Sequence, residues 1–567
     1  MRTYQLTTEA NGRSRVVVPY RAAALLAESM YNKSSAFTLE ERRLFGLEGL
    51  LPSVVSPMAI QAQRVYENIV RKSEPLERYV GLAALQDRNE YLYYRVLLDH
   101  LEEFLPIVYT PTVGQASKEF SHIFRRGRGI WITPDHRGRI REVLENAPFD
   151  GVRLVVATDN QAILGIGDQG AGGMVIPIGK LAIYCAAAGI HPAETLPISL
   201  DVGTNNEDLL GDDLYLGWRR PRLTGEPYFE LVDEFVAALR DLFPGALLQW
   251  EDFQKSNAFE LLDRYRNRIL SFNDDIQGTG ATALAGLLAA TRISGLPLSE
   301  QRVVIVGGGA AGMGIAHQLR IALSAAGVGG ENLSHAVAVL DSRGLIVDDR
   351  ERLDAYKRRF AWPAALAQRT GLEGNRALAD VVGRLRPTAL IGTSGQAGLF
   401  SEEIVSDMAG HTDRPVIFPF SNPTALAEAR PEDLYRWTDG RSLVATGSPF
   451  TPVTWEGREH RIGQGNNAFV FPGVGLGALV AGAESITDEM FTAAATALAD
   501  SVTEDDLEHG QLYPAIGRLR EVTQRIAVAV AAQVPVEGAR AGGTPDDLNR
   551  EVADAMWSPE YPDLDAG

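Results

Sequence analysis

Cysteine is almost absent from this chain, which has a single one, Cys185, among 567 residues. An intramolecular disulfide is therefore excluded, and Cys185, within the apolar stretch "LAIYCAAAGI", is expected to be a small core residue. The sequence also lacks an uninterrupted apolar run of membrane-spanning length. Its first residues contain no apolar segment of the signal-peptide kind. These absences predict a cytoplasmic protein with no membrane partner.

Basic residues are outnumbered, with 54 lysines and arginines against 73 acidic residues and a formal net charge of −19. Such a charge argues against nucleic acid or an anionic membrane as the main partner. It leaves room for an anionic substrate, because a local pocket can oppose the field of the whole protein. The apolar content of 45% is ordinary for a soluble protein with a sizeable core.

The hydrophobic pattern changes its character along the chain. The first part is mostly helical, with an interruption near Pro75, and strand-like and helical segments then alternate. We therefore expect an α/β fold with a helical N-terminal region, a mostly parallel α/β substrate domain and a Rossmann-type, doubly wound dinucleotide-binding domain. The expected boundaries are 1–127 for the helical region, 128–273 with 463–535 for the substrate- and metal-binding domain, 274–462 for the Rossmann-type domain, and 536–567 for a C-terminal tail.

Two acidic pairs follow short apolar runs that read as buried strands. Glu251 and Asp252 stand in "LLQWEDFQKSNAF", and Asp274 and Asp275 stand in "ILSFNDDIQGTG". Carboxylates at the ends of buried strands are costly unless a counter-charge meets them. A single pair is more often a helix cap or a solvated turn. Two pairs of the same construction favour a site for a hard cation with oxygen ligands.

A glycine-rich turn follows another strand, in "VVIVGGGAAG". Its glycines permit a tight turn, and the helix that follows presents free N–H groups to a pyrophosphate. The next strand, "AVAVLD", ends on Asp341, a candidate for the ribose hydroxyls. The alternative is a plain glycine turn with an unrelated acid. The expected cofactor contacts of the turn are Gly307, Gly309, Ala310, Ala311 and Gly312.

The choice between NAD and NADP is left open by the residues after that strand. Asp341 favours NAD, because a carboxylate suits the ribose hydroxyls and repels a 2′-phosphate. Four nearby side chains are able to accept such a phosphate, so NADP is a possible cofactor. They are Ser342, Arg343, Lys357 and Arg358.

Other polar residues stand at loop or strand ends. Lys180 follows the glycine-rich "GDQGAGGMVIPIG" and enters an apolar helix, where burial near a cation would make it a general base, although a helix lysine often extends to solvent. Tyr109, in "PIVYTPTVG", reads as the end of an apolar strand and is a candidate proton donor or a structural tyrosine. Amides able to hold a carboxylate, or to form turns, are Asn422, Asn466 and Asn467.

Taken together these motifs resemble the malic enzyme family over nearly the whole chain, and the bacterial NAD-dependent members most. The resemblance is carried by "YTPTVG", "ILGIGDQG", "IPIGKLAIY", "LDVGTNNEDLL", "WEDF", "FNDDIQGT", "FSNPT" and "GQGNN". It implies oxidative decarboxylation of L-malate to pyruvate and CO₂ with NAD and Mg²⁺ or Mn²⁺, by a homodimer or homotetramer. It also implies these roles: Glu251, Asp252 and Asp275 as metal ligands, Asp274 as an acid beside them, Lys180 as general base, Tyr109 as general acid, Asn422 and Asn466 as malate contacts, and Asn422 as a contact of the cofactor as well.

The chain departs from the family pattern at Ala162, where many members carry an arginine that grips a substrate carboxylate. Arg153, in the same segment, is our candidate for the replacing cation. Malolactic enzymes, which convert malate to lactate with retained NAD, also lack that arginine and are the alternative function. Gln169 stands where we associate tryptophan with that group, and it speaks against the alternative.

A third possibility is a catalytically silent nucleotide sensor, but a binding protein has no use for the base and the acid. Fumarate-activated members use two arginines and an acid. Arg64 and Arg88 match the arginines, whereas Ser56 occupies the acidic position, so fumarate activation is not expected.

Overall fold

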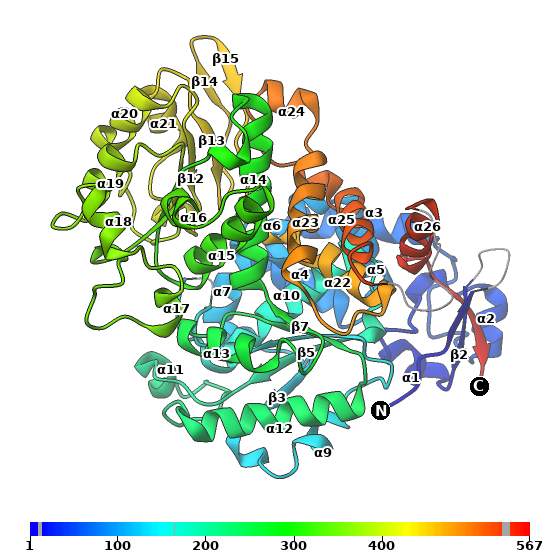
Figure 1. The fold of residues 1–567 in the computed structure, drawn as a ribbon. Helices are drawn as coiled ribbons and strands as arrows, with labels where there is room; N and C mark the ends of the chain where they lie inside the picture. Colours follow the sequence, from blue (N-terminus) through cyan, green and yellow to red (C-terminus); the bar gives the residue numbers. More distant parts are fainter. Residues whose placement is uncertain (9–13, 164, 536–544) are drawn as a thin grey trace. The chain divides into compact units, whose positions relative to one another are not determined.

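The structure is a computed structural model that describes residues 1–8, 14–163, 165–535 and 545–567. The chain forms two compact units, which we call the N unit, Met1–Phe253 with Asp554–Gly567, and the C unit, Gln254–Ala553 (Figure 1).

This division differs from the expected one, which joined residues 463–535 to the substrate domain. Helix α23 (Asp488–Asp500) packs against α14 (Thr279–Ser294) and α25 (Leu519–Ala531), and these contacts hold the later helices within the C unit.

Helices make up most of the first part of the N unit, as the sequence predicts. Pro75, where the sequence predicts an interruption, is the first residue of α4, a position that suits proline. The helices are α1 (Ala22–Ala27), α2 (Leu39–Leu44), α3 (Met58–Val70), α4 (Pro75–Gln86), α5 (Glu90–Asp99), α6 (Leu101–Val108), α7 (Thr112–Lys118) and α8 (Phe120–Ile123).

A parallel sheet forms the centre of the N unit, in the order β3-β5-β4-β6. Its strands are β3 (Ile130–Ile132), β5 (Thr195–Leu200), β4 (Leu154–Thr158) and β6 (Leu247–Trp250). Helix α10 (Val175–Ile183) packs on β4 and β5, and α12 (Glu226–Leu242) packs on α9 (Ile140–Leu144). Because the strands are parallel, the residues after β4, β5 and β6 share one edge, where ligands of such sheets bind.

One helical stretch of the N unit, Gly170–Ala188, is apolar and long enough to span a membrane, but 94% of its window is buried inside the protein. It is therefore a core helix, and Cys185 is fully buried in it, as expected.

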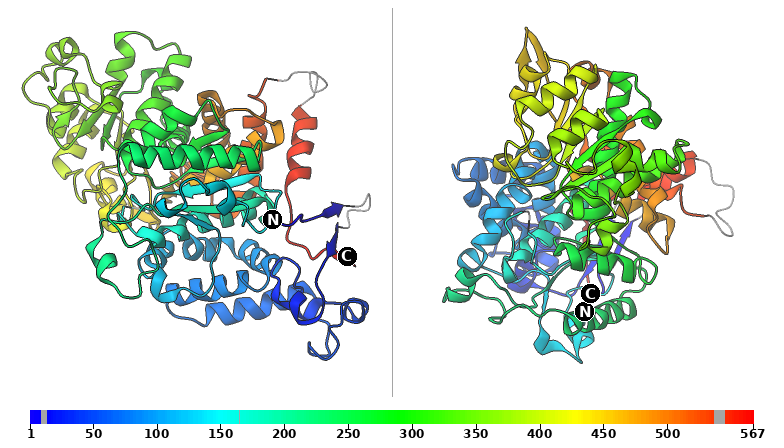
Figure 2. Two further views of the ribbon diagram at one scale, coloured as in Figure 1. Left: turned by 90° about the horizontal axis from the view of Figure 1, so that it is seen from below. Right: turned by 60° about the vertical axis from the view of Figure 1, so that its left-hand side comes forward.

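The two ends of the chain meet in a small sheet of the N unit. Strand β17 (Asp563–Ala566) runs parallel to β2 (Ser14–Val18), which pairs antiparallel with β1 (Leu6–Thr8). Both views of Figure 2 show the chain ends close together. The described part of the expected tail thus contains a helix, α26 (Pro545–Ala555), and a paired strand; residues 536–544 lie outside the described residues.

The C unit contains the predicted doubly wound sheet, in the order β10-β9-β8-β11-β12-β13-β16. Strand β8 lies where the order reverses, next to β11, so the turns after these two strands form the switch point at which such folds bind ligands. The strands are β8 (Val303–Val306), β9 (Val337–Asp341), β10 (Gly344–Leu345), β11 (Ala389–Gly392), β12 (Val416–Pro419), β13 (Leu443–Thr446) and β16 (Gly463–Gln464).

Helices cover this sheet, and a separate hairpin joins β14 (Val453–Trp455) to β15 (Arg458–His460). Strand β7 (Ser271–Asn273) precedes the second acidic pair. The remaining helices are α13 (Lys255–Tyr265), α15 (Ala310–Ala325), α16 (Glu331–Ala336), α17 (Ala355–Arg358), α18 (Ala364–Arg369), α19 (Leu378–Leu385), α20 (Glu402–His411), α21 (Pro431–Trp437), α22 (Phe471–Ala481) and α24 (Glu504–Glu508).

Candidate active site

A buried ion pair stands at the carboxyl edge of the N-unit sheet. Glu251 directly follows β6, and its Oε1 lies 2.9 Å from Nζ of Lys180 on α10. The two side chains are 2% and 1% exposed. Gln249 Nε2 donates to the other carboxylate oxygen at 2.8 Å. Each charge can be buried because it meets its counter-charge. The burial of Lys180 excludes the alternative that this lysine extends to solvent.

Asp252, the second acid of this pair, is buried and has a left-handed backbone with φ of 57°. An aspartate tolerates that conformation better than most residues. Its carbonyl oxygen accepts a hydrogen bond from the Ala162 N–H at 3.0 Å. The loop after β4, which carries Ala162, is therefore fixed to the residue that we expect to ligate a metal.

Tyr109 lies near the buried lysine, with the ring centre 5.3 Å from Lys180 Nζ. The prediction that it ends a strand is wrong, because Tyr109 caps the C-terminus of helix α6. A short apolar run does not distinguish a buried strand from a buried helix. Here the run is the end of an amphipathic helix, even though it contains Pro106.

Arg153 lies far from this edge of the sheet, because it precedes the first residue of β4 whereas Glu251 follows the last residue of β6. Its Nη1 pairs with Glu194 Oε2 at 3.4 Å, and its side chain is 48% exposed. The structure therefore does not support Arg153 as a substrate contact, and the proposed site does not include it.

In the C unit, Asp274 begins the helical turn after β7 and is fully buried. Asn467 Nδ2 donates to its Oδ2 at 3.1 Å and to its carbonyl oxygen at 3.2 Å. Asp275 follows in the same turn and is partly exposed. Asn467, which the sequence presents only as one amide among several, thus holds Asp274, the first acid of the second pair.

The glycine turn after β8 has the shape that a dinucleotide requires. Gly307 has φ of 134°, and a side chain there would collide with Thr393 after β11. A side chain at Gly312 would collide with the Gly307 carbonyl. In front of Gly309, which caps α15, no heavy atom lies within 4 Å of the place of a Cβ. That space lies at a helix N-terminus and fits a pyrophosphate.

Asp341 ends β9 as predicted, and two cations hold its carboxylate. Lys357 Nζ and Arg350 Nη1 each lie 2.8 Å from one of its oxygens. Burial works to raise the pKa of Asp341, but the hydrogen bonds from Lys357 and Arg350 outweigh it and lower the pKa to about 2. Lys357, one of the cations considered for a 2′-phosphate, is therefore engaged with the acid itself.

Asn422 and Asn466 both use their side-chain oxygens locally. Asn422 Oδ1 accepts from Ser448 Oγ at 2.5 Å, and Asn466 Oδ1 accepts from the Ala468 N–H at 2.9 Å. With the oxygens so oriented, the amide nitrogens are the groups that would donate to a carboxylate.

Glu428 is a residue of this region that the sequence does not reveal. It is fully buried and accepts hydrogen bonds from the Ser394 N–H at 2.7 Å and from Ser421 Oγ at 2.5 Å. It therefore joins the loops after β11 and β12. Its surroundings in sequence, "LAEARPEDL", are charged and read as a solvated segment.

Comparison with known proteins agrees with this architecture. Residues 86–266 match the family model "Malic enzyme, N-terminal domain" and residues 276–534 match "Malic enzyme, NAD binding domain". The chain is 46% identical to the NAD-dependent malic enzymes of Aeromonas hydrophila, over 98% of both chains, and of Sodalis glossinidius, over the same shares. In fold it resembles the malic enzyme of Entamoeba histolytica, with a TM-score of 0.55, 22% identity and coverage of 91% of this chain and 92% of the other.

Proposed function

Because the chain belongs to the malic enzyme family, we propose that it decarboxylates L-malate oxidatively to pyruvate and CO₂ with reduction of NAD. The observation that carries this proposal is the buried Lys180–Glu251 pair beside Tyr109. A lysine enclosed with a carboxylate and a tyrosine offers the proton acceptor and the proton donor that the two halves of the reaction need.

We assign a divalent cation, Mg²⁺ or Mn²⁺, to Glu251, Asp252 and Asp275. Carboxylate oxygens are the ligands that these hard cations prefer. The cation supplies Lewis acidity toward the hydroxyl and carboxylate oxygens of the substrate when it is bound. Asp274, held by Asn467, orients the turn that carries Asp275.

Lys180 is charged while it pairs with Glu251; were that carboxylate to hold a cation, the neutral form of the lysine would be favoured. In the proposed reaction, the neutral amine of Lys180 accepts the proton of the C2 hydroxyl as hydride leaves C2 for the nicotinamide. The C4 carboxylate is then lost as CO₂, and Tyr109 donates a proton to C3 to give pyruvate. The amide groups of Asn422 and Asn466 hold the substrate carboxylates without titrating. The glycine turn from Gly307 to Gly312 holds the pyrophosphate, and Asp341 holds the adenosine ribose.

The test is direct. Purified protein with L-malate, Mn²⁺ and NAD is expected to form NADH and pyruvate in equal amounts, with less product when NADP replaces NAD. Failure with both dinucleotides would overturn the proposal. Lactate without net NADH would identify a malolactic enzyme instead, an outcome that the names of the relatives do not favour.

We also propose that the protein is a cytoplasmic homodimer or homotetramer. The support is the likeness to bacterial enzymes, together with exposed apolar side chains between residues 39 and 60 of the N unit, including Leu39, Leu50 and Val54. Light scattering at several protein concentrations tests the assembly state, and a monomer at all of them would reject it.

A further inference from the structure

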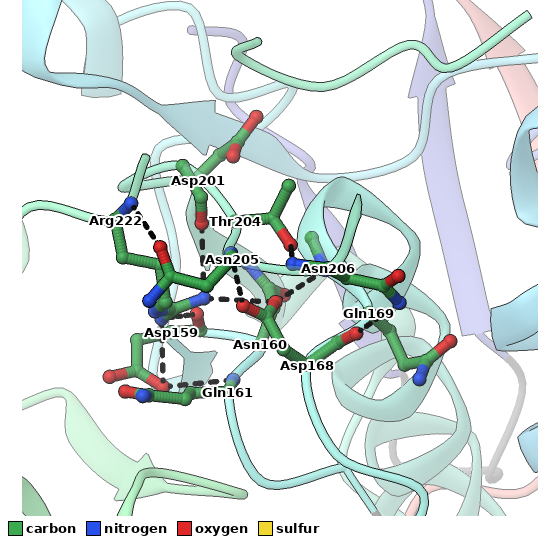
Figure 3. A network of polar contacts seen from close by, with 12 residues as sticks. Asp159, Asn160, Gln161, Asp168, Gln169, Asp201, Thr204, Asn205, Asn206 and Arg222 are labelled. Atoms are coloured by element: carbon green, nitrogen blue, oxygen red, sulfur yellow. Dashed lines mark hydrogen bonds and ion pairs between the residues drawn. The ribbon is translucent and has the colours of Figure 1, made fainter. Parts of the chain in front are cut away.

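A buried arginine holds both ends of the loop that follows β4. This loop, which we call the β4 loop, is described over residues 159–163 and 165–168, and it precedes the helical stretch that carries Lys180. Arg222 lies in the segment before α12, and its side chain is 2% exposed. Figure 3 shows it among the polar residues of the loop, with dashed contacts to the loop on one side and to the residues after β5 on the other.

The two arms of the guanidinium reach opposite ends of the β4 loop. Nη2 donates to the carbonyl oxygen of Asp159 at 2.5 Å, and Nη1 donates to Asp168 Oδ1 at 3.1 Å. Nη1 also donates to the Gly203 carbonyl at 3.0 Å. Tyr228 Oη donates to Asp159 Oδ2 at 2.8 Å, which fastens the same end to α12. The fork of an arginine is able to make such paired contacts, whereas a lysine has a single charged centre.

A short series of contacts connects these ends to the acid after β6. Gly167, next to Asp168, pairs with Ile163 through two hydrogen bonds of 3.2 Å. Ala162, the residue before Ile163, donates its N–H to the Asp252 carbonyl at 3.0 Å. Asp252 has a left-handed backbone, which needs support from its surroundings. Hydrogen bonds and peptide bonds within the N unit thus connect the loop to Asp252, so the position of the loop constrains the backbone of Asp252.

We infer that Arg222 is a positioning residue for the divalent cation: by holding the β4 loop at both ends, it fixes Asp252 through Ala162. This inference rests on the proposed function, because it takes Asp252 to be a metal ligand. Residues that orient metal ligands typically contribute about 10- to 100-fold to metal affinity. A merely structural role for Arg222 would instead lower stability and leave metal affinity in the folded protein unchanged.

The test is Mn²⁺ titration of the full-length protein, followed by the loss of the free-ion EPR signal, without malate or nucleotide. Arg222→Lys keeps the charge but cannot reach both ends of the loop, so its Mn²⁺ dissociation constant is expected to rise about tenfold or more. Arg220→Lys is the matched control, because Arg220 is exposed two residues away, and it is expected to bind as wild type does.

Two further measurements separate positioning from stability. The folded fraction, from circular dichroism, and the dissociation constant of NAD, from fluorescence, are expected to stay at wild-type values in Arg222→Lys. If that variant fails to fold, Tyr228→Phe replaces it, because it removes one contact to Asp159 and is expected to weaken Mn²⁺ about threefold.

The outcomes are distinguishable. Folded Arg222→Lys, or Tyr228→Phe in its place, with wild-type Mn²⁺ affinity overturns the positioning role and leaves the proposed function standing. Wild-type protein that binds no Mn²⁺ overturns the metal site and this inference together.

Discussion

Two buried lysine–glutamate pairs in the N unit have the same chemistry and different settings. Lys33 Nζ lies 2.5 Å from Glu41 Oε1, and the other Glu41 oxygen accepts the Thr38 N–H at 2.9 Å as part of a helix capping box. In the pair of Lys180 with Glu251, the glutamate directly follows the parallel strand β6, and a second acid, Asp252, comes next in the chain. The first glutamate completes a helix terminus, whereas the second adds to a concentration of negative charge that suits a cation.

Replacing each lysine by alanine should give the largest difference between the two pairs, and the difference should appear in kcat. We expect Lys180→Ala to lower kcat by about 100- to 10,000-fold, the usual contribution of a general base. Lys33→Ala should leave kcat within about twofold, because its pair lies at a helix cap. Both variants leave a buried carboxylate without its lysine, which costs about 3–5 kcal/mol of stability. The midpoint temperature of thermal unfolding should therefore fall in both. Equal kcat values in the two folded variants would contradict the assignment of the base.

Asp275→Asn tests whether the second acidic pair serves a cation. The Mn²⁺ concentration for half-maximal rate should rise at least about 100-fold, since even residues that only orient ligands contribute about 10- to 100-fold. Asp263→Asn is the control, because Asp263 is an exposed partner of Arg359. Titration of Mn²⁺ at saturating malate and NAD measures the effect, and an unchanged midpoint for Asp275→Asn would remove it from the ligand set.

Asp341 extends the comparison to a carboxylate with two cations. Its pKa is lowered to about 2 in the folded protein, whereas an aspartate in the unfolded chain has a pKa of about 4. Ionised Asp341 therefore stabilises the folded protein above about pH 4, and this contribution is lost as the pH falls toward 2. Asp341→Asn should therefore lower the free energy of unfolding by ~1–2 kcal/mol at neutral pH and by much less near pH 2.5. Urea unfolding at the two pH values measures this difference, with the exposed Asp500→Asn as control. A pH-independent difference would argue against the ion pairs.

The smallest effect concerns the helix cap of the first pair. Thr38→Ala removes the Oγ1 that accepts the Glu41 N–H at 3.1 Å, and it should lower the free energy of unfolding by about 1 kcal/mol. The kcat should not change, as judged by initial rates at saturating substrates. A loss of turnover in the folded variant would mean that the cap, too, influences the catalytic region.

Features built from local pattern could be predicted from the sequence. The glycine turn at Gly307, the strand that ends on Asp341 and the helix that starts at Pro75 each follow from residues that are neighbours in the chain. The assignment of Tyr109 to a strand failed because its apolar run is short enough for either element.

Residues whose partners are distant in sequence could not be found in this way. Glu428 stands in a charged segment that reads as solvated, and only the folded chain brings it to Ser394, 34 residues away in sequence. Arg153 illustrates the opposite error, since closeness to Ala162 in sequence placed it at the wrong end of β4. The parallel strand carries residues at its two ends to opposite edges of the sheet.

The pairing of β17 with β2 has a consequence for synthesis of the protein. Strand β2 contributes the buried Val16 and Val18, and its parallel neighbour β17, with the buried Leu564, lies about 550 positions later in the sequence, beyond the C unit. The ribosome releases those residues only after the C unit has been made. The N unit, although first to emerge, must therefore leave one edge of this sheet unfinished until residues 563–566 have been made. Chaperone binding to the nascent chain would be most useful at that edge.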